Sequence, residues 1–156
     1  MGRYINQNKI GYMMYKLILI LTFLSFNLHS KNNLVVYMSP TCGCCTYWVK
    51  HMEENGFSVE TVKINNVDSI KIVNKISPQI SSCHTGIIDG YFVEGHVPAK
   101  DVKRMLSLRP KIRGLAVPGM PAGSNVPGME TKKTPAKYDV LSIEYNGVNQ
   151  IWSQYK

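Results

Sequence analysis

The sequence lacks an apolar run long enough to cross a membrane. Its longest run, residues 17–28, has 12 residues, whereas a transmembrane helix needs about 20. No cysteine lies near the end of this run, which argues against a lipid anchor there. No acidic residue precedes position 31, and Lys16 leads directly into the run. A short apolar core behind basic residues is typical of a secretory signal peptide.

We therefore expect residues 1–30 to be a signal peptide and the protein to be exported. Ser30 is a permissible small residue before a cleavage point. Translation from Met13 or Met14 would give a signal of usual length. After cleavage we expect no stable insertion into the membrane. An uncleaved N-terminal anchor is the alternative that the sequence leaves open.

A dense basic cluster is also lacking. The chain has 18 Lys and Arg against 10 Asp and Glu, a formal net charge of +8, but its lysines are scattered and aromatic residues do not interleave them. Nucleic acid is therefore not an expected partner. Hydrophobic residues make up 44% of the 156-residue chain. This length and composition predict a single globular domain over residues 31–156.

Cysteine is scarce, yet three of the four cysteines fall within Cys42-Gly43-Cys44-Cys45. In an exported protein, four cysteines would by default form two structural disulfides. A structural framework usually spreads its cysteines along the chain, and adjacent residues such as Cys44 and Cys45 rarely pair with each other. The clustering therefore favours redox or metal chemistry.

The cysteine cluster lies where a predicted strand gives way to a predicted helix. Apolar residues 34–38 precede it, and helical spacing follows from about Cys44 to Asn55. Unpaired backbone N–H groups and the helix dipole at such a helix start favour thiolate over thiol. Thiolate is the form that attacks disulfides and binds metals. We therefore expect the chemistry of this protein to take place here.

The chain then continues to alternate between strands and helices. Asp89-Gly90 between two apolar runs predicts a hairpin. Apolar spacing at Val67, Ile70, Val73 or Asn74, and Ile76 predicts the second helix. The predicted elements are strand 34–38, helix 44–55, strand 57–64, helix 67–76, strands 84–88 and 91–95, and a helix over 98–108.

This β-α-β-α-β-β-α order, with a Cys-x-x-Cys at the first strand-to-helix junction, is the thioredoxin-like pattern. The predicted fold class is therefore α/β and thioredoxin-like. In such folds the loop before the third strand, which normally carries a cis-proline, lies against the active-site cysteines. Here Ser82-Cys83-His84-Thr85 occupies that loop without a proline. The resemblance implies that all four cysteines meet at one point, joined by His84.

A C-terminal extension, residues 109–156, follows this pattern. Its segment Leu115 to Pro135 is rich in Pro and Gly and repeats Val-Pro-Gly-Met. We expect a long loop there, neither a regular helix nor a central strand, that acts in function or covers the site. Asn146-Gly147 predicts a final β-hairpin over residues 138–155 that extends or covers the sheet.

Four motifs occur in order within residues 34–145. They are Cys-Gly-Cys-Cys at 42–45, Ser-Cys-His-Thr at 82–85, Tyr-Phe-Val-Glu-Gly-His-Val-Pro at 91–98, and Gly-Leu-Ala-Val-Pro-Gly-Met-Pro at 114–121. Together they resemble the CopG-type family, small exported proteins associated with copper resistance in Gram-negative bacteria. The resemblance implies a periplasmic protein that handles copper. One departure is the segment 124–129, which is slightly longer than the family's Gly-Ser-Pro-Gly-Met.

The donor chemistry agrees with that family, because thiolates are soft ligands that select Cu(I), although zinc or an iron–sulfur cluster also accepts four of them. Three cysteines on one corner can bridge several metal ions, so a multinuclear copper site is expected. The expected metal ligands are Cys42, Cys44, Cys45 and Cys83, and further candidates are His84, His96, Met120 and Met129. The alternatives for the further candidates are a hydrogen-bonding loop residue, a helix cap and gap-filling methionines.

Two functions from different classes follow. The first is copper handling or resistance, with copper ions and a periplasmic copper-handling or redox protein as partners, and with coupled redox activity at Cys42 and Cys45. The second is a metal-free thiol–disulfide oxidoreductase acting on exported proteins. An oxidoreductase needs only that pair, whereas a thiolate metal site also needs Cys44 and Cys83. A passive carrier that passes copper to a partner is a third interpretation.

Overall fold

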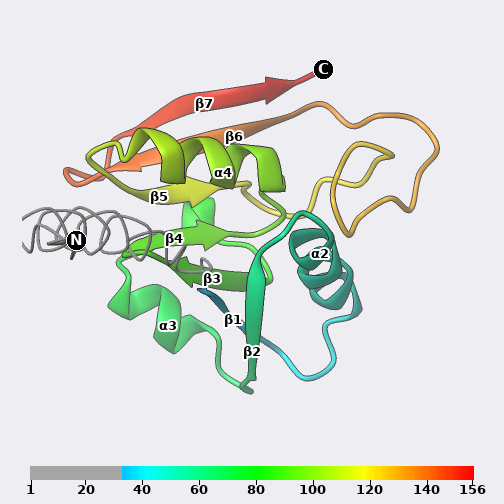
Figure 1. The fold of residues 1–156 in the computed structure, drawn as a ribbon, viewed down its shortest axis with the longest axis horizontal. Helices are drawn as coiled ribbons and strands as arrows, with labels where there is room; N and C mark the ends of the chain where they lie inside the picture. Colours follow the sequence, from blue (N-terminus) through cyan, green and yellow to red (C-terminus); the bar gives the residue numbers. More distant parts are fainter. Residues whose placement is uncertain (1–32) are drawn as a thin grey trace, which may run out of the picture. The chain divides into compact units, whose positions relative to one another are not determined.

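The computed structural model describes residues 33–156. The expected signal peptide, its cleavage point and its alternative starts lie outside the described residues. The described chain forms one seven-stranded sheet with the order β2-β1-β3-β4-β5-β6-β7 (Figure 1). The elements are β1 Asn33–Met38, α2 Gly43–Glu54, β2 Ser58–Lys63, α3 Asp68–Val73, the 3-10 helix η1 Pro78–Ile80, β3 His84–Ile88, β4 Tyr91–Glu94, α4 Ala99–Leu108, β5 Ile112–Ala116, β6 Tyr138–Glu144 and β7 Asn149–Tyr155.

The first four strands and three helices confirm the thioredoxin-like α/β fold. Strand β1 pairs in parallel with β2 and antiparallel with β3, and β3 and β4 form the expected hairpin. Asp89 and Gly90 both have positive φ, 48° and 83°, as a type I′ turn requires. Gly56 also has a positive φ, 88°, and follows the end of α2 as a C-terminal stop.

Alternating side chains give the sheet two apolar faces. Leu34, Val36 and Met38 of β1 belong to a core that also contains buried residues of α2 and α4. The opposite face carries a smaller core of Ile76, Ile80, Phe92, Ala116 and Ile143. Helix α2, whose first turn carries the cysteines, is therefore anchored by the larger core. Trp48 fixes it further, because its buried indole N–H donates to the Val97 carbonyl over 2.9 Å.

The prediction of a loop from Leu115 onward is wrong at its start. Leu115 and Ala116 are fully buried in β5, which pairs in parallel with β4 and antiparallel with β6. The first proline, Pro118, follows the strand and does not interrupt it. Gly114 allows the strands to approach, since a Cβ there would lie 2.1 Å from the Phe92 carbonyl oxygen.

The apolar face predicted for the second helix is correct in part, because Val67, Ile70 and Asn74 are half-buried but Val73 is not. Val73 and its neighbour Ile72 are 79% and 75% exposed, whereas the buried residue of α3 is Lys71. Apolar spacing misled here because the helix is short and its buried position holds an ion-paired side chain, described below.

The C-terminal hairpin β6–β7 extends the sheet beyond β5, with β7 at the edge opposite β2 (Figure 1). Asp101 of α4 fastens it, because its carboxylate accepts hydrogen bonds from Ser153 and Tyr155, each 2.5 Å long. The Tyr155 ring also stacks on Tyr138, with ring centroids 4.5 Å apart.

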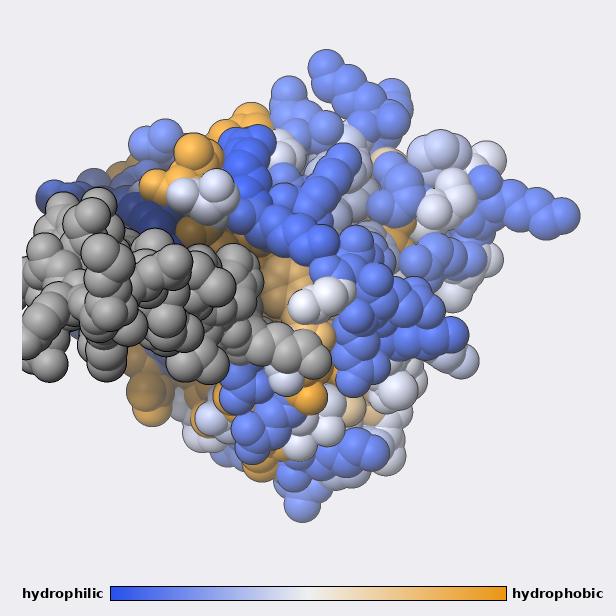
Figure 2. Space-filling model, viewed as in Figure 1, coloured by the Kyte–Doolittle hydropathy of each residue, from blue (hydrophilic) through white to orange (hydrophobic). Residues whose placement is uncertain are grey.

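Among the described residues, no helix is both long and apolar enough to cross a membrane. On the face shown in Figure 2, hydrophilic side chains cover most of the described surface, and hydrophobic ones appear in small separate groups.

Candidate metal centre

The cysteine motif lies between the carboxyl end of β1 and the first turn of α2. Cys42 is the N-cap residue of α2, in an extended conformation, and Cys44 and Cys45 lie in the first turn. The turn before the helix is closed by the Cys42 N–H, which donates to the Ser39 carbonyl over 3.2 Å. The cysteines therefore sit at a helix N-terminus, as the sequence predicts.

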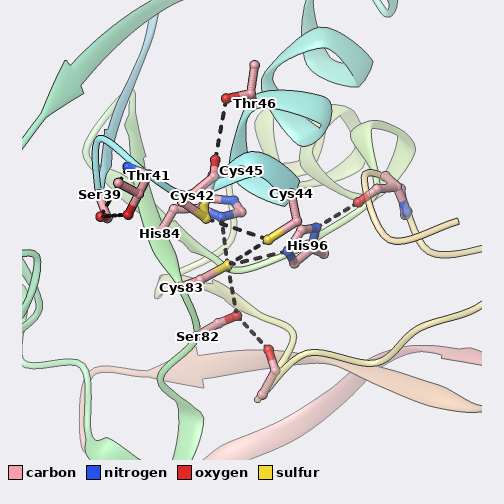
Figure 3. The surroundings of a disulfide bond; sticks show 12 residues. Ser39, Thr41, Cys42, Cys44, Cys45, Thr46, Ser82, Cys83, His84 and His96 are labelled. Atoms are coloured by element: carbon pink, nitrogen blue, oxygen red, sulfur yellow. Dashed lines mark hydrogen bonds between the residues drawn. A yellow bond between two sulfur atoms is a disulfide. The ribbon is translucent and has the colours of Figure 1, made fainter. Parts of the chain in front are cut away.

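Cys42 and Cys45 form a disulfide, with 5.4 Å between their Cα atoms, while Cys44 is a free thiol (Figure 3). Cys45 is fully buried. The Sγ atom of Cys44 lies 3.5 Å from that of Cys42. The pair with Cys-x-x-Cys spacing is thus the disulfide-bonded pair of the motif, and Cys44 is not part of that bond.

Cys83, one residue before β3, brings the fourth sulfur to the same place. Its Sγ lies 3.9 Å from Cys44 Sγ, and the sulfur atoms of all four cysteines lie within 4.8 Å of one another. Burial, with the nearby Cys44 adding to it, raises the pKa of the Cys83 thiol to about 11. Cys83 is therefore a protonated thiol at neutral pH in this disulfide state.

His96, which follows β4, is fully buried with its ring between Cys83 and a loop carbonyl. Its Nδ1 lies 2.7 Å from the Pro127 carbonyl oxygen, and because a carbonyl only accepts, Nδ1 carries the proton. Burial lowers the pKa of His96, so the ring is neutral and Nε2 bears a lone pair. That lone pair faces Cys83 Sγ at 3.4 Å, where it accepts the thiol proton or serves as a ligand.

His84, the first residue of β3, is also fully buried beside Cys83. Its Nδ1 lies 3.4 Å from Cys83 Sγ, and its ring packs against Trp48 and His96 with centroids 4.4 and 5.1 Å away. Burial lowers the pKa of His84 well below its ordinary value, and repulsion from Lys71, and from His96 when it is protonated, adds to this effect. Its Nε2 has no hydrogen-bond partner among the described residues, so this ring has a free nitrogen inside the protein.

The Pro/Gly-rich loop covers this centre. Gly128 has a positive φ, 78°, and a Cβ there would lie 2.7 Å from the Trp48 nitrogen and 2.8 Å from the Cys44 carbonyl oxygen. The loop thus lies directly on the first two turns of α2. On its other side, the Ser82 hydroxyl donates to the Gly119 carbonyl over 2.5 Å.

The two methionines of the loop are placed differently from the histidines. The Met120 side chain is 60% exposed and lines a surface pocket with Pro121, Tyr138 and Leu141. Met129 is half-buried, and its N–H closes a turn onto the Val126 carbonyl.

Two further residues near the site have roles that sequence reasoning missed. His51 of α2 accepts the Ala99 N–H over 3.1 Å through Nε2 and so caps α4, the role considered for His96. Glu94, fully buried at the end of β4, forms an ion pair with Lys71. A charged residue directly after the apolar run Tyr91-Phe92-Val93 was the available signal for it.

Comparison with known proteins agrees with this geometry. Residues 80–129 match the family described as "Protein of unknown function, DUF411", a range that includes Cys83, His84 and His96 but not the motif at 42–45. Two solved structures of copper resistance protein CopG, forms 2 and 1, are each 38% identical and cover 81% of this chain. This chain covers 100% and 98% of theirs, with TM-scores of 0.77 and 0.76. The chain belongs to the CopG copper-resistance family. No curated protein sequence matches it.

The donor set found here fits the soft metal that the family name implies. Four sulfur atoms form one group of possible ligands, and Cys83 with the imidazoles of His84 and His96 forms a second group that shares the Cys83 sulfur. The Nε2 atom of buried His84 has no hydrogen-bond partner among the described residues, so it is a further nitrogen that could act as a ligand. Hard cations prefer oxygen ligands, whereas thiolates select Cu(I) and other soft ions.

Proposed function

We propose that this chain is an exported copper-binding protein that contributes to copper handling or resistance. The observation that carries the proposal is the convergence of four cysteine sulfurs within 4.8 Å of one another. A protein disulfide oxidoreductase needs two of these sulfurs, so Cys44 and Cys83 are unexplained without a metal. The relatives of known structure are copper resistance proteins by title, which supports copper as the metal.

Cu(I) is the proposed bound form, held by the thiolates of Cys42, Cys44, Cys45 and Cys83. Four bridging sulfurs in one corner can hold more than one ion, so the proposed site is multinuclear. His96 is the best supported additional ligand, because its proton is held on Nδ1 by a loop carbonyl. His84 and Met120 are additional candidates, and the exposure of Met120 makes loop movement a requirement for its participation.

The disulfide couples this binding to redox state. In the disulfide form only Cys44 and Cys83 offer thiols. Reduction of the Cys42–Cys45 bond by two electrons and two protons releases two more sulfur ligands. In the reverse direction, the dithiol gives one electron to each of two Cu(II) ions, which yields two Cu(I), the disulfide and two protons. Redox activity at Cys42 and Cys45 is therefore part of the proposal.

The proposed location is the periplasm, which agrees with the relatives' family and with the leader expected in residues 1–30. Residues 31–156 would then form the mature single domain, with residues 109–156 as its extension. Copper ions are the proposed ligands, and a periplasmic copper-handling or redox protein is the proposed partner.

The second candidate function is a metal-free thiol–disulfide oxidoreductase acting on exported proteins. The Cys42–Cys45 disulfide at a helix N-terminus favours it, because the helix dipole stabilises the thiolate that leaves or attacks. In this case the Cys44→Ser and Cys83→Ser variants would keep full disulfide-reducing activity on a protein substrate.

An anaerobic Cu(I) titration of the reduced protein from Lys31 onward, against a competing chelator, tests the proposal. We expect tight binding of more than one copper, lost in Cys44→Ser and in Cys83→Ser. Weak binding that neither substitution changes would reject the copper function and favour the oxidoreductase. Thiol counting before and after addition of Cu(II) then tests the redox step, which consumes two thiols for two Cu(II).

A further inference from the structure

A buried ion pair lies behind Cys83, on the face of the sheet opposite α2. Lys71 Nζ of α3 lies 2.5 Å from Glu94 Oε1 of β4, and both side chains are buried. Lys71 also donates to the Thr85 hydroxyl over 3.1 Å. Neither charged residue belongs to the sulfur cluster.

The Glu94 carboxylate holds the residues on both sides of Cys83 and His84. Its Oε1 accepts the Ser82 N–H over 2.6 Å, and its Oε2 accepts the Thr85 hydroxyl over 2.6 Å. One rigid, charged group therefore fixes the backbone before Cys83 and the side chain after His84. Charge-assisted bonds of this kind are the stronger class of hydrogen bond.

Close packing next to Glu94 leaves this segment little freedom. A Cβ on Gly95 would lie 2.6 Å from Ser82 Oγ and 2.7 Å from the Val117 carbonyl oxygen. The Gly95 N–H donates to the His84 carbonyl over 3.1 Å. A small displacement of Glu94 would therefore move Ser82 and His84, and Cys83 lies between them.

Fold stability alone does not account for a charged pair at this position. Removing two charges from water costs more than an isolated pair usually returns, and apolar residues of similar volume often serve as well or better. The carboxylate's bonds all go to Lys71 and to the residues flanking the Cys83–His84 step. Cys83 is the single cysteine of the cluster that does not lie at the start of α2, so its placement depends on this segment.

We propose that Glu94, neutralised by Lys71, is a positioning residue for Cys83. The pair holds the Cys83 sulfur within reach of Cys44 and of the two imidazoles, although it touches none of them. This inference deepens the proposed function and rests on it for the copper readout only. The position of the Cys83 thiol can be measured without any metal.

The test uses two readouts. The alkylation rate of Cys83 is measured on the disulfide form, and the Cu(I) affinity is measured on the reduced form. In a Cys44→Ser background with the Cys42–Cys45 bond intact, Cys83 is the sole free thiol, and its alkylation rate reports how well it is held. In the reduced protein with Cys44 restored, a chelator competition gives the Cu(I) affinity. Loss of an outer-shell partner typically lowers metal affinity by about 10- to 100-fold.

Glu94→Gln should speed Cys83 alkylation several-fold and weaken Cu(I) binding in that range, because it leaves the Lys71 ammonium buried without a countercharge. The double variant Glu94→Gln/Lys71→Met should return both readouts toward wild type. It removes both charges, and the side-chain amide at position 94 can still form hydrogen bonds with Ser82 and Thr85. Asp101→Asn is the matched control. It alters another buried carboxylate that accepts two hydrogen bonds, but in the C-terminal hairpin.

The proposal is overturned if Glu94→Gln changes neither readout more than Asp101→Asn does. It is also overturned if the double variant alkylates as fast as the single variant. Should Glu94→Gln fail to fold, Lys71→Met replaces it in the same comparison, because it also breaks the ion pair and leaves the Glu94 carboxylate without its countercharge. If wild-type protein binds no Cu(I), the copper function fails, and the alkylation rates still test the positioning.

Discussion

His96 and Pro127 are joined by a 2.7 Å hydrogen bond that links the C-terminal loop to the sulfur cluster. The bond fixes the proton on Nδ1 and directs the lone pair of Nε2 at Cys83 Sγ. Residues 31 positions apart in the chain thereby set the tautomer of one imidazole. The loop is thus part of the site as well as its cover.

The first prediction concerns this imidazole. His96→Phe keeps a ring of similar volume but removes the donor to Pro127 and the lone pair toward Cys83. We expect Cu(I) affinity to fall by at least about 10- to 100-fold, which is the usual effect of removing a residue that supports a metal ligand. A chelator competition on reduced protein measures it, with His51→Gln as the control histidine outside the cluster. Equal affinities for His96→Phe and wild type would reject the role of His96.

The second prediction concerns the contact between the loop and α2. Gly128→Ala places a Cβ within 2.8 Å of backbone atoms of Cys44 and Trp48 at a positive φ, so the loop must lift. We expect a loss of about 1–3 kcal/mol in unfolding free energy and faster alkylation of Cys44 and Cys83. Gly119→Ala is the matched control, because it has a similar φ of 67° and no atom within 4 Å. It should lower stability through backbone strain alone and leave the alkylation rates unchanged. An equal increase of the alkylation rates in both variants would contradict the conclusion that the loop covers the cysteines.

The thioredoxin-like part of the fold could be predicted because its signals are local. Asp89-Gly90 determines a hairpin turn by itself, and the Cys-x-x-Cys at the first strand-to-helix junction identifies the fold class. The meeting of Cys83 with the motif followed from topology, since the loop before β3 lies beside the start of α2. Strand β5 was not predictable in the same way, because its pairing with β4 depends on a glycine whose neighbour, Phe92, is distant in sequence.

Side-chain partners explain the rest of what sequence reasoning missed. From the sequence alone, Lys71 is expected to be solvated. In the structure it lies 2.5 Å from Glu94, which belongs to a strand distant in sequence. His51 is likewise expected at the surface, but in the structure it accepts a hydrogen bond from the Ala99 N–H of α4. Both roles depend on a contact between elements that are far apart in the sequence.

The third prediction concerns alkaline stability. Burial raises the pKa of Tyr155, with its hydrogen bond to Asp101 adding to the effect, and burial with Asp101 likewise raises the pKa of Tyr138. Above about pH 10 the unfolded chain loses protons that the folded chain retains. The unfolding free energy should therefore fall as the pH rises above about 10. Chemical denaturation at pH 8 and 10.5 measures this. The unfolding free energy of Tyr155→Phe should fall less than that of wild type, and an equal fall would contradict the linkage. Cys83, whose pKa is raised to about 11, accounts for part of the fall that remains in the variant.

The fourth prediction concerns acid. Burial lowers the pKa of His51, although Glu130 and Glu54 oppose the effect, and protonation of Nε2 would remove the acceptor that caps α4. A folded pKa below the unfolded value of about 6.5 means that the unfolded chain binds more protons as the pH falls. Stability should therefore decline below about pH 6.5. His84 and His96, whose pKa values burial also lowers, contribute with the same sign.

A His51→Ala variant separates the cap from the other two histidines. At pH 7.5 it should lose about 1 kcal/mol of unfolding free energy, the usual value of a helix N-cap. Between pH 7.5 and 5 its stability should decline less than that of wild type, because one of the three titrating groups is gone. Urea unfolding at both pH values measures the difference. A decline equal to wild type would mean that His51 titrates alike in the folded and unfolded chains. The acid sensitivity would then belong to the histidines beside Cys83 and not to the cap of α4.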